Sequence, residues 1–318
     1  IFFLYKFEYH IHMNNSNDDL ALNNDLNLLE LLNSLWKDKF KILLITTLFS
    51  IFSIFYALSL PNYYESKALL SISNSNEESN LMSSLSSTYG GLASMAGIRI
   101  PGQASGNRAA LAEELLKSRS FVKHLIEVDP YITRNLIAVK SYNFNKNFFE
   151  YDDKIYITEK DKWIIEKPTY LDVHDIYLSK VLSVYKNIET GYLTVSVEHL
   201  SPVYAKNLLT LIIDELNDIV RSQDLIQSTN SLIFLEEKAR DASINKIKLS
   251  INEIIESQLK TQMLAAINKD HLLKKIDPPF IPEKKSSPRR GFLCIVITCF
   301  GFLIGILFSI TKNFIYRK

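Results

Sequence analysis

The sequence has little cysteine, and none of it lies in the long central region. Of 318 residues only two are cysteine, Cys294 and Cys299, and both fall in one apolar stretch. Five positions apart on a helix, they would point about 140° away from each other, so they cannot form a disulfide together. Residues 61–290 therefore have no disulfide, which fits either side of a membrane.

Motifs of known catalytic and phosphate-binding sites are also absent. The chain has no G-x-x-x-x-G-K-[S/T] loop, no H-E-x-x-H, no G-x-S-x-G and no C-x-x-C. Its six histidines are scattered, and no two have the spacing of metal ligands on one helix face. The net charge is +1, so electrostatics give no case for a nucleic-acid partner. We expect no catalytic, metal-binding or cofactor-binding residue, and no enzymatic activity.

Long apolar stretches without charge stand near both ends of the chain. One runs from Ile42 to Leu60 and the other from Gly291 to Thr311. Each has about 20 residues, enough for a helix to cross a bilayer, and a charge at the bilayer centre would cost several kcal/mol. The alternative is a pair of buried core helices, which are usually amphipathic and shorter. The sequence predicts transmembrane helices at residues 42–60 and 291–311, with both termini on the same side.

Positive charge near the two spans is divided almost evenly between the two sides. Because long loops cross a membrane largely regardless of charge, the short tails count more. We therefore expect residues 1–41 and 312–318 to be cytoplasmic tails and the large loop to lie outside. The charged residues are Lys37, Lys39, Lys41, Lys312, Arg317 and Lys318 on the terminal side, and Lys67, Lys284, Lys285, Arg289 and Arg290 on the loop side.

The first residues of the chain do not resemble a leader. The chain begins with Ile1, and Met13 opens an Asn-rich run, so residues 1–12 are interpreted as upstream translated sequence or as the end of a fragment. A signal peptide is the competing interpretation, but it needs a basic start and a small-residue cleavage site.

Glycine is unevenly placed between the spans. Five of the nine glycines lie between Gly90 and Gly106, after a Ser-rich stretch, so residues 74–107 are predicted to be a mobile loop. This loop is either a passive linker or a segment that packs against a neighbouring subunit. Before it, Tyr63–Ser73 alternates as a strand does. After it, Arg108–Val128 has the composition of a helix.

The clearest strand pattern lies between Leu182 and His199. Alternate apolar residues from Leu193 to Val197 fall on one face, and Gly191 lies in the preceding turn. Lys154–Thr158 is a further, short candidate strand. With the intervening helices, these strands predict a mixed α/β base over residues 61–200.

From Val203 to Asp277 the chain has neither glycine nor proline, and Ser201-Pro202 suits a helix start. Residues 201–277 are therefore predicted to be a long helical extension. If continuous, it would span roughly 105 Å, so it would project, and its apolar stripe would meet another helix as in a coiled coil. The alternative is two or three helices folded back on themselves, with breaks near residues 222–224 or 228–230. The stripe consists of Leu208, Ile212, Leu216, Ile219, Ile244, Ile247, Ile251 and Ile254.

Two short motifs lie at the second span. Residues 278–290 are rich in proline, which removes backbone donors and favours an extended strut between the helical extension and the membrane. A helix stop with a basic interfacial anchor is the simpler alternative. Within the span, Gly301, Gly305 and Ser309 form a ridge of small residues that lets helices approach closely. The candidate residues of the proline-rich motif are Pro278, Pro279, Pro282, Ser287, Pro288 and Arg289.

Taken in order, these segments resemble the Wzz family of polysaccharide co-polymerases, the O-antigen chain-length determinants. The resemblance covers Asn23 to Tyr316. Two departures are Arg289, where the family usually has Lys, and Phe302, where it often has a second Gly. The matching segments are Gly90–Ile98 (a small-residue loop), Gly191–Asn217 (a strand leading into the long helix), Pro279 to Arg289 (the proline-rich motif) and Gly301 with Gly305 (the glycine ridge).

The resemblance implies an α+β membrane protein, in which two transmembrane helices flank a periplasmic mixed α/β base with a long projecting helical rod. Copies of the chain would form a ring in the bacterial inner membrane. The ring would set the modal length of the lipid-linked O-antigen by acting, without catalysis, on the polymerase. Expected partners are therefore further copies, the O-antigen polymerase and the lipid-linked polysaccharide. With only residues 312–318 after the second span, no fused tyrosine kinase is expected.

Two other functions stay open at this point. The first is a membrane adaptor of a capsule or exopolysaccharide export system that works with a separate tyrosine kinase. The second is a sensory ectodomain that has lost its output module. The sensory hypothesis would require a ligand pocket in residues 63–200, where the sequence shows no convergent polar cluster.

Overall fold

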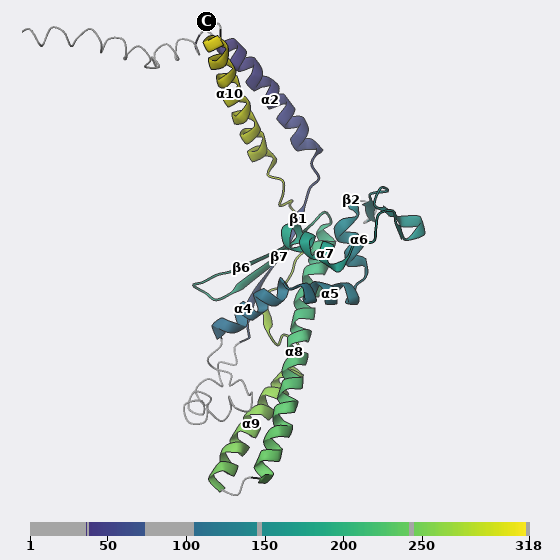
Figure 1. Cartoon of the computed structure of the whole chain (residues 1–318), viewed down its shortest axis with the longest axis vertical. Helices are drawn as coiled ribbons and strands as arrows, with labels where there is room; N and C mark the ends of the chain where they lie inside the picture. Colours follow the sequence, from purple (N-terminus) through teal and green to yellow (C-terminus); the bar gives the residue numbers. More distant parts are fainter. Residues whose placement is uncertain (1–35, 37, 74–104, 145–147, 242–244, 316–318) are drawn as a thin grey trace, which may run out of the picture. The chain divides into compact units, whose positions relative to one another are not determined.

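The computed structural model describes residues 36, 38–73, 105–144, 148–241 and 245–315. The chain divides into two compact units (Figure 1). The first holds the two apolar helices, and the second, Pro61–Ser287, holds the α/β base and a helical hairpin. The predictions for residues 1–12 and for the loop at 74–104 lie outside the described residues.

Both predicted spans are helices that are long and apolar enough to cross a membrane. They are α2 (Lys39–Ser59) and α10 (Arg290–Ile315). Only 17% of the apolar window of each helix is buried. Core helices of a soluble protein hide most of their surface, so this exposure argues against the alternative of buried core helices.

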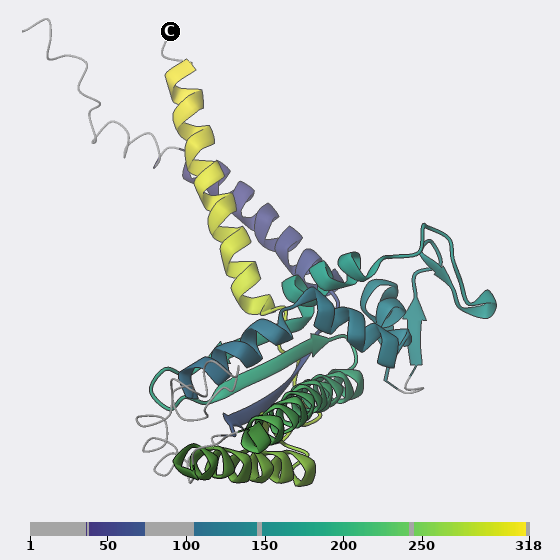
Figure 2. The same ribbon diagram turned by 60° about the horizontal axis from the view of Figure 1, so that its bottom comes forward.

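The base is built on one four-stranded antiparallel sheet in the order β6-β7-β1-β8. Strand β1 (Tyr64–Ile72) lies between β7 (Leu193–His199) and β8 (Leu273–Asp277), and β6 (Leu182–Lys186) is the outer neighbour of β7. The predicted hairpin is present, and Gly191 has φ +72° in its turn, where a residue without Cβ is favoured. Figure 2 shows helix α8 beside these strands.

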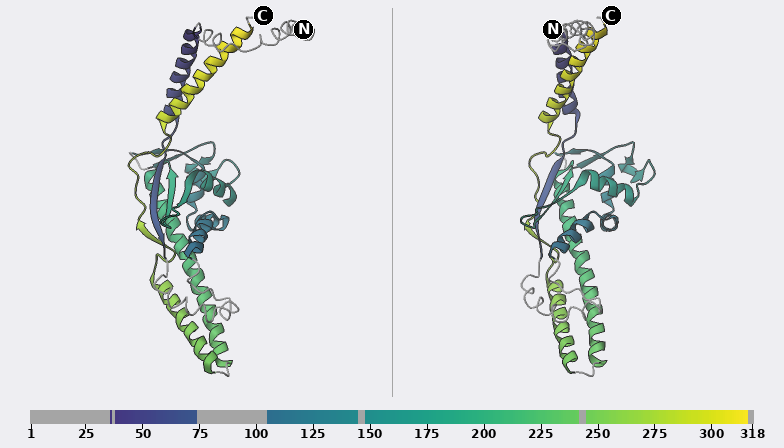
Figure 3. Two further views of the ribbon diagram at one scale, coloured as in Figure 1. Left: turned by 90° about the vertical axis from the view of Figure 1, so that its left-hand side faces the viewer. Right: turned by 60° about the vertical axis from the view of Figure 1, so that its left-hand side comes forward.

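The helical extension is a hairpin and not one continuous rod. Helix α8 (Pro202–Asp241) starts as predicted, with Tyr204 N donating to Ser201 Oγ at 3.2 Å. Helix α9 (Asn245–Ile267) runs back along α8 (Figure 3). Of the two arrangements considered for the extension at residues 201–277, the structure therefore shows the folded-back one, and the last residues of the extension form strand β8 (Leu273–Asp277) instead of helix. The proposed breaks at 222–224 and 228–230 both lie inside α8.

Strand β8 is the second departure from that prediction. It lies within residues 203–277, which contain no glycine or proline, yet it pairs antiparallel with β1 from Ile72↔Leu273 to Leu69↔Asp277. Leu272 and Leu273 are fully buried at this edge of the sheet. Ladder hydrogen bonds and burial therefore outweigh local helix propensity here.

The apolar side chains along the first half of α8 are covered by the base, so they do not need a second chain to bury them. Leu208, Ile212 and Leu216 are buried in the main core, where they meet sheet residues such as Val195. Further along, Leu235 packs against Ile251, Ile254 and Ile255 of α9. Both halves of the described stripe are thus covered by the same chain.

Four α-helices that precede the β6–β7 hairpin complete the core. The predicted helix at 108–128 is two helices, α4 (Ser105–Leu116) and α5 (Arg119–Val128), followed by α6 (Tyr131–Ile137). The break occurs because Ser118 is extended (φ −76°, ψ 147°) and its hydroxyl accepts from Phe121 N at 3.2 Å. This N-cap starts α5 afresh. Helix α7 (Tyr170–Ile176) and a π-helical turn, η2 (Tyr177–Val181), lead into β6.

Two small hairpins fill the region between α6 and α7, and the second of them includes a two-residue strand inside the candidate strand at Lys154–Thr158. They pair β2 (Val139–Asn143) with β3 (Phe148–Tyr151), and β4 (Tyr156–Ile157) with β5 (Lys162–Trp163); η1 (Thr158–Lys160) joins the second pair. Aromatic rings hold this lobe to the sheet, because Phe149 meets both His199 and Tyr204 edge-on at 5.6 Å.

His199 is the buried polar residue at this contact. Its Nε2 lies 3.0 Å from Asn135 O, and Ser201 N donates to its Nδ1 at 3.1 Å. These partners place the single ring proton on Nε2. Burial lowers the pKa of His199 from 6.5 to about 4, although the bond to Asn135 favours the charged form.

We predict that acid destabilises the base through His199. Between pH 6.5 and about 4 the unfolded histidine binds a proton that the folded one does not, so stability falls as pH falls through this window. Between pH 7 and 5 the loss should be about 2 kcal/mol, measured by chemical denaturation of the detergent-solubilised protein. His199→Gln should be less stable at pH 7 but should lose correspondingly less on acidification. An equal loss in both proteins would contradict this role.

Candidate functional site

The described residues hold no group of three or more His, Cys, Asp or Glu side chains that could bind a metal ion. The features that stand out are three joints between segments far apart in the sequence. They are a strap along the sheet edge, a polar junction at the root of the α8–α9 hairpin, and the contact between α2 and α10.

The strap is the proline-rich segment, residues 278–287, which lies beside the first half of β1. Ser66 Oγ of β1 donates to Phe280 O at 2.7 Å, and Pro282 is buried. Further along, Tyr63 N donates to Ser287 O at 3.0 Å, and Ser286 N donates to Tyr63 O at 2.9 Å. The segment is extended as its prolines favour, but it is bonded to the base at Phe280 and at its end, so it is not a free strut.

Glu198 of β7 fastens the end of the strap. The hydroxyls of Ser286 and Ser287 both donate to Glu198 Oε1 at 2.6 Å. Charge-assisted bonds of this kind are about twice as strong as neutral ones. The beginning of β1, the end of β7 and the end of the strap are therefore joined at one point, which we call the clip: Tyr63, Glu198, Ser286 and Ser287.

The predicted motif residues have different surroundings. Ser287 belongs to the clip. The other clip residues, Glu198, Tyr63 and Ser286, were not predicted from the sequence. Nothing in the local sequence indicates that Glu198 bonds to Ser286 and Ser287, which lie 88 and 89 positions away. Arg289 O accepts from Leu293 N in the first turn of α10. Of the others, Pro278 is exposed, Pro279 and Pro288 are half-buried, and Pro282 is buried.

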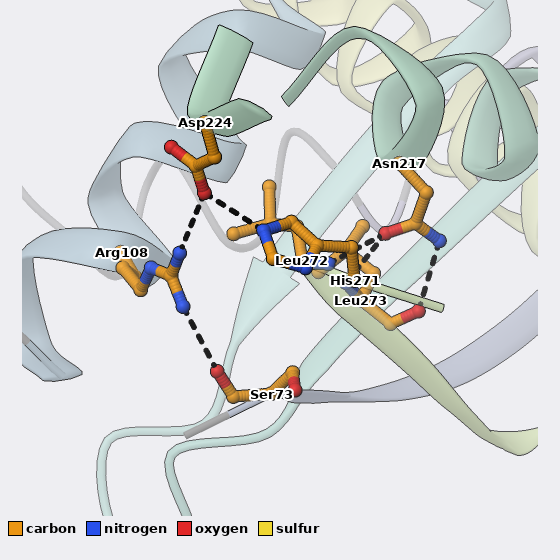
Figure 4. A network of polar contacts seen from close by, with 7 residues as sticks. All are labelled: Ser73, Arg108, Asn217, Asp224, His271, Leu272 and Leu273. Atoms are coloured by element: carbon orange, nitrogen blue, oxygen red, sulfur yellow. Dashed lines mark hydrogen bonds and ion pairs between the residues drawn. The ribbon is translucent and has the colours of Figure 1, made fainter. Parts of the chain in front are cut away.

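The polar junction ties the start of β8 to α8 (Figure 4). The buried side chain of Asn217 takes part in three bonds: its Oδ1 accepts from Leu272 N at 2.9 Å and from Leu273 N at 2.7 Å, and its Nδ2 donates to Leu273 O at 3.0 Å. One amide side chain thus supplies the donor and acceptors that a neighbouring strand would supply.

A charged cluster extends the junction toward α4. Asp224 Oδ2 lies 3.0 Å from Arg108 Nη2 and 2.8 Å from His271 Nε2, and Arg108 Nη1 donates to Ser73 O at 3.4 Å (Figure 4). Ser73 and Arg108 stand on either side of residues 74–104, so the cluster brings the two flanks of that segment together. Sequence inspection missed it because its members are up to 198 positions apart, as the numbers of Ser73 and His271 show.

The ridge of small residues on α10 faces α2 of the same chain. A Cβ placed on Gly301 would overlap the side chain of Phe49, and one on Gly305 would lie 3.2 Å from Ile42 Cγ2. One turn further, Ser309 Oγ lies 3.3 Å from Asp38 Oδ2. Small residues therefore let the two helices meet closely, and a polar contact ends the ridge.

We predict that Asn217→Ala destabilises the base. It leaves two buried N–H groups and one carbonyl without their partner, so the free energy of unfolding should fall by about 3 kcal/mol. Asn207→Ala, at an exposed asparagine of the same helix, is the matched control and should change stability by less than about 0.5 kcal/mol. Denaturant titration of both variants measures the difference, and equal stabilities would contradict the assigned role.

We also predict that Gly301→Leu separates α2 from α10. The new side chain must displace Phe49, and overpacking of this kind costs about 1–3 kcal/mol. Cys294 Sγ lies 3.8 Å from Ser53 O, so Ser53→Cys with Cys299→Ser provides a pair for oxidative cross-linking of the two helices. Gly301→Leu should lower the cross-linked fraction. Gly291→Leu should not, because a Cβ there meets no atom within 4 Å; equal fractions in the two variants would refute the contact.

The chain is similar to a family of chain length determinant proteins and to two solved polysaccharide co-polymerases. A family model described as "Wzz: Chain length determinant protein" matches residues 24–128. A solved structure described as a full-length bacterial polysaccharide co-polymerase aligns with 92% of this chain and 99% of its own, at 14% identity and a TM-score of 0.38. A fragment of WzzB, a polysaccharide co-polymerase from Salmonella Typhimurium, aligns with 71% of this chain and 100% of its own, at 12% identity and a TM-score of 0.31.

No curated protein matches the chain. Because identity and TM-score to both structures are low, no residue role is transferred from either. The family match begins before α2 and runs through β1, α4 and α5, so it takes in the first apolar helix and the central strand of the base. Over residues 24–128, about a third of the chain, the protein is similar to the Wzz family of chain length determinant proteins.

Proposed function

We propose that this protein sets the modal chain length of the lipid-linked O-antigen and that it does so without catalysing bond formation. The observation that carries the proposal is the family match over residues 24–128. Such a regulator has to hold partners in a defined arrangement, and it needs no reactive side chain. The strap, the clip and the junction are contacts that give a base of this kind a fixed geometry.

The proposed location is the bacterial inner membrane, with α2 and α10 as its two spans. Both tails are cytoplasmic and the base is periplasmic in this proposal. Support comes from the length and apolar character of the helices and from the lysines of the short tails, which weigh more than charges on a long loop.

The proposed partners are further copies of the chain, arranged in a ring, together with the O-antigen polymerase and the lipid-linked polysaccharide. The α8–α9 hairpin supports assembly, because it carries large apolar side chains that this chain leaves uncovered. Ile226, Ile233, Met263 and Ile267 are between 62% and 74% exposed.

Deletion of the gene followed by complementation tests the function. In the deletion strain the O-antigen ladder on a gel of extracted lipopolysaccharide should lose its modal band, and the full chain should restore it. An unchanged ladder would refute the proposal. If capsule export failed while the ladder stayed the same, the adaptor function with a separate kinase would replace it.

The same strain tests whether the strap takes part. Pro279→Ala with Pro282→Ala loosens the half-buried and buried part of the strap and should alter the restored length distribution. Pro278→Ala, at the exposed proline of the same segment, is the matched control and should restore the normal distribution. Immunoblots that show equal protein levels exclude loss of the protein as the cause. A normal ladder in the double variant would show that the strap takes no part in setting the chain length.

A further inference from the structure

The side chain of Asp38 is buried between the two apolar helices. Among the residues that the structure describes, it is the only aspartate or glutamate that is buried. It directly precedes α2, and its Oδ2 accepts from Ser309 Oγ of α10 at 3.3 Å. Removing a carboxylate from water is costly unless charged or hydrogen-bonding groups surround it. The groups around Asp38 therefore define the chemistry of this end of the helix pair.

Two lysines, one from each helix, converge on this carboxylate. Lys41 Nζ of α2 donates to Asp38 Oδ1 at 2.5 Å. This hydrogen bond is the main cause that lowers the pKa of Asp38; burial opposes it, and the charges of Lys41 and of Lys312 on α10 add to it. Two ammonium groups and one carboxylate leave these three side chains with a net positive charge.

Both lysines lie at the border of the apolar stretches. Lys41 directly precedes residues 42–60, and Lys312 directly follows residues 291–311. The helices run antiparallel, so that the start of α2 lies beside the end of α10 (Figure 1). If both helices cross a bilayer with a hydrocarbon core of about 30 Å, the two ammonium groups lie at one border of that core. Phospholipid headgroups begin at the same level.

A third lysine at the same border has different surroundings. Lys39 Nζ lies 5.0 Å from the centre of the Trp36 ring and 5.6 Å from that of Phe40. Tryptophan favours the layer between headgroups and acyl chains, so its presence fits this level of the membrane. Lys39 has the charge and the depth of Lys41 but belongs to the aromatic pair and not to the group around Asp38.

The charge of this point is set by its side chains and not by the helix dipoles. The start of α2 carries partial positive charge and the end of α10 partial negative charge, and side by side they offset each other. The ammonium groups of Lys41 and Lys312 therefore favour an anion. Each has three donors on a flexible stem, which suits the oxygens of a phosphate, and basic side chains between transmembrane helices bind anionic headgroups.

We propose that Lys41 and Lys312 together bind the phosphate of one anionic phospholipid, in the leaflet next to the start of α2 and the end of α10. Asp38 supplies the negative charge that lets the two ammonium groups lie together, and the lipid phosphate supplies the second. The proposal rests on the proposed location of α2 and α10 in the membrane, and it is independent of which polysaccharide the protein regulates.

Native mass spectrometry of the full chain in detergent tests the site. The protein is titrated with phosphatidylglycerol or with zwitterionic phosphatidylcholine at about 0.15 M salt, which screens exposed charges. Each chain should bind one phosphatidylglycerol about tenfold more tightly than phosphatidylcholine. Lys41→Gln and Lys312→Gln should each weaken phosphatidylglycerol binding about tenfold, because a hydrogen bond between charged groups is lost. Lys41→Arg and Lys312→Arg should keep it. Lys39→Gln is the matched control and should weaken it less than about threefold.

Three results would overturn the proposal. Equal losses in Lys39→Gln and Lys312→Gln would show only a general attraction to a basic helix end. Equal affinities for the two lipids would show no preference for an anionic headgroup. Displacement of phosphatidylglycerol by inorganic phosphate would show that the site takes the free anion.

The cross-link between α2 and α10 described above reports whether the helix pair is intact in each variant. If one glutamine variant loses the pair, the other glutamine variant decides. A normal O-antigen ladder in the Lys312→Gln strain leaves the lipid site standing, and an unchanged ladder after deletion of the gene refutes only the proposed function.

Discussion

The hydrogen-bonded contact between Tyr63 and Ser287 is the constraint on which the rest of the base depends. It joins two residues 224 positions apart, as their numbers show, at the point where the chain enters and leaves the base. Glu198 adds a third segment to this point by accepting from Ser286 and Ser287. Tyr63 and Ser287 are held together, and β1 runs away from this point. One edge of β1 pairs with β7, so β8 and the strap return along its other edge.

Elements whose pattern is local could be predicted from the sequence. The two apolar helices, strand β1 and the turn at Gly191 follow from uncharged stretches, alternation and a residue that accepts positive φ. The helix start at Ser201 follows from its capping hydroxyl. In each case the deciding interaction is made within a few residues, or with solvent or lipid, so the pattern suffices.

Elements that depend on distant partners could not be predicted in this way. The sequence around Leu273 contains no glycine or proline, and only its pairing with β1 and its bonds to Asn217 make it a strand. The clip and the cluster around Asp224 likewise join residues that share no local signal. The glycine ridge lies between these cases: its small residues indicate a close helix contact, but its partner, Phe49, is visible only in the structure.

The junction at Asn217 also separates the two parts of α8. Up to Val220, the helix is fixed against the main core by residues such as Ile212 and Leu216. Further along, α8 packs against α9 through residues such as Leu235, and after α9 the chain returns to a fixed point at Leu273. Whole turns added to or removed from the far ends of both helices would therefore leave the sheet and the clip unchanged. The hairpin is a part whose reach can be altered in evolution independently of the platform that carries it.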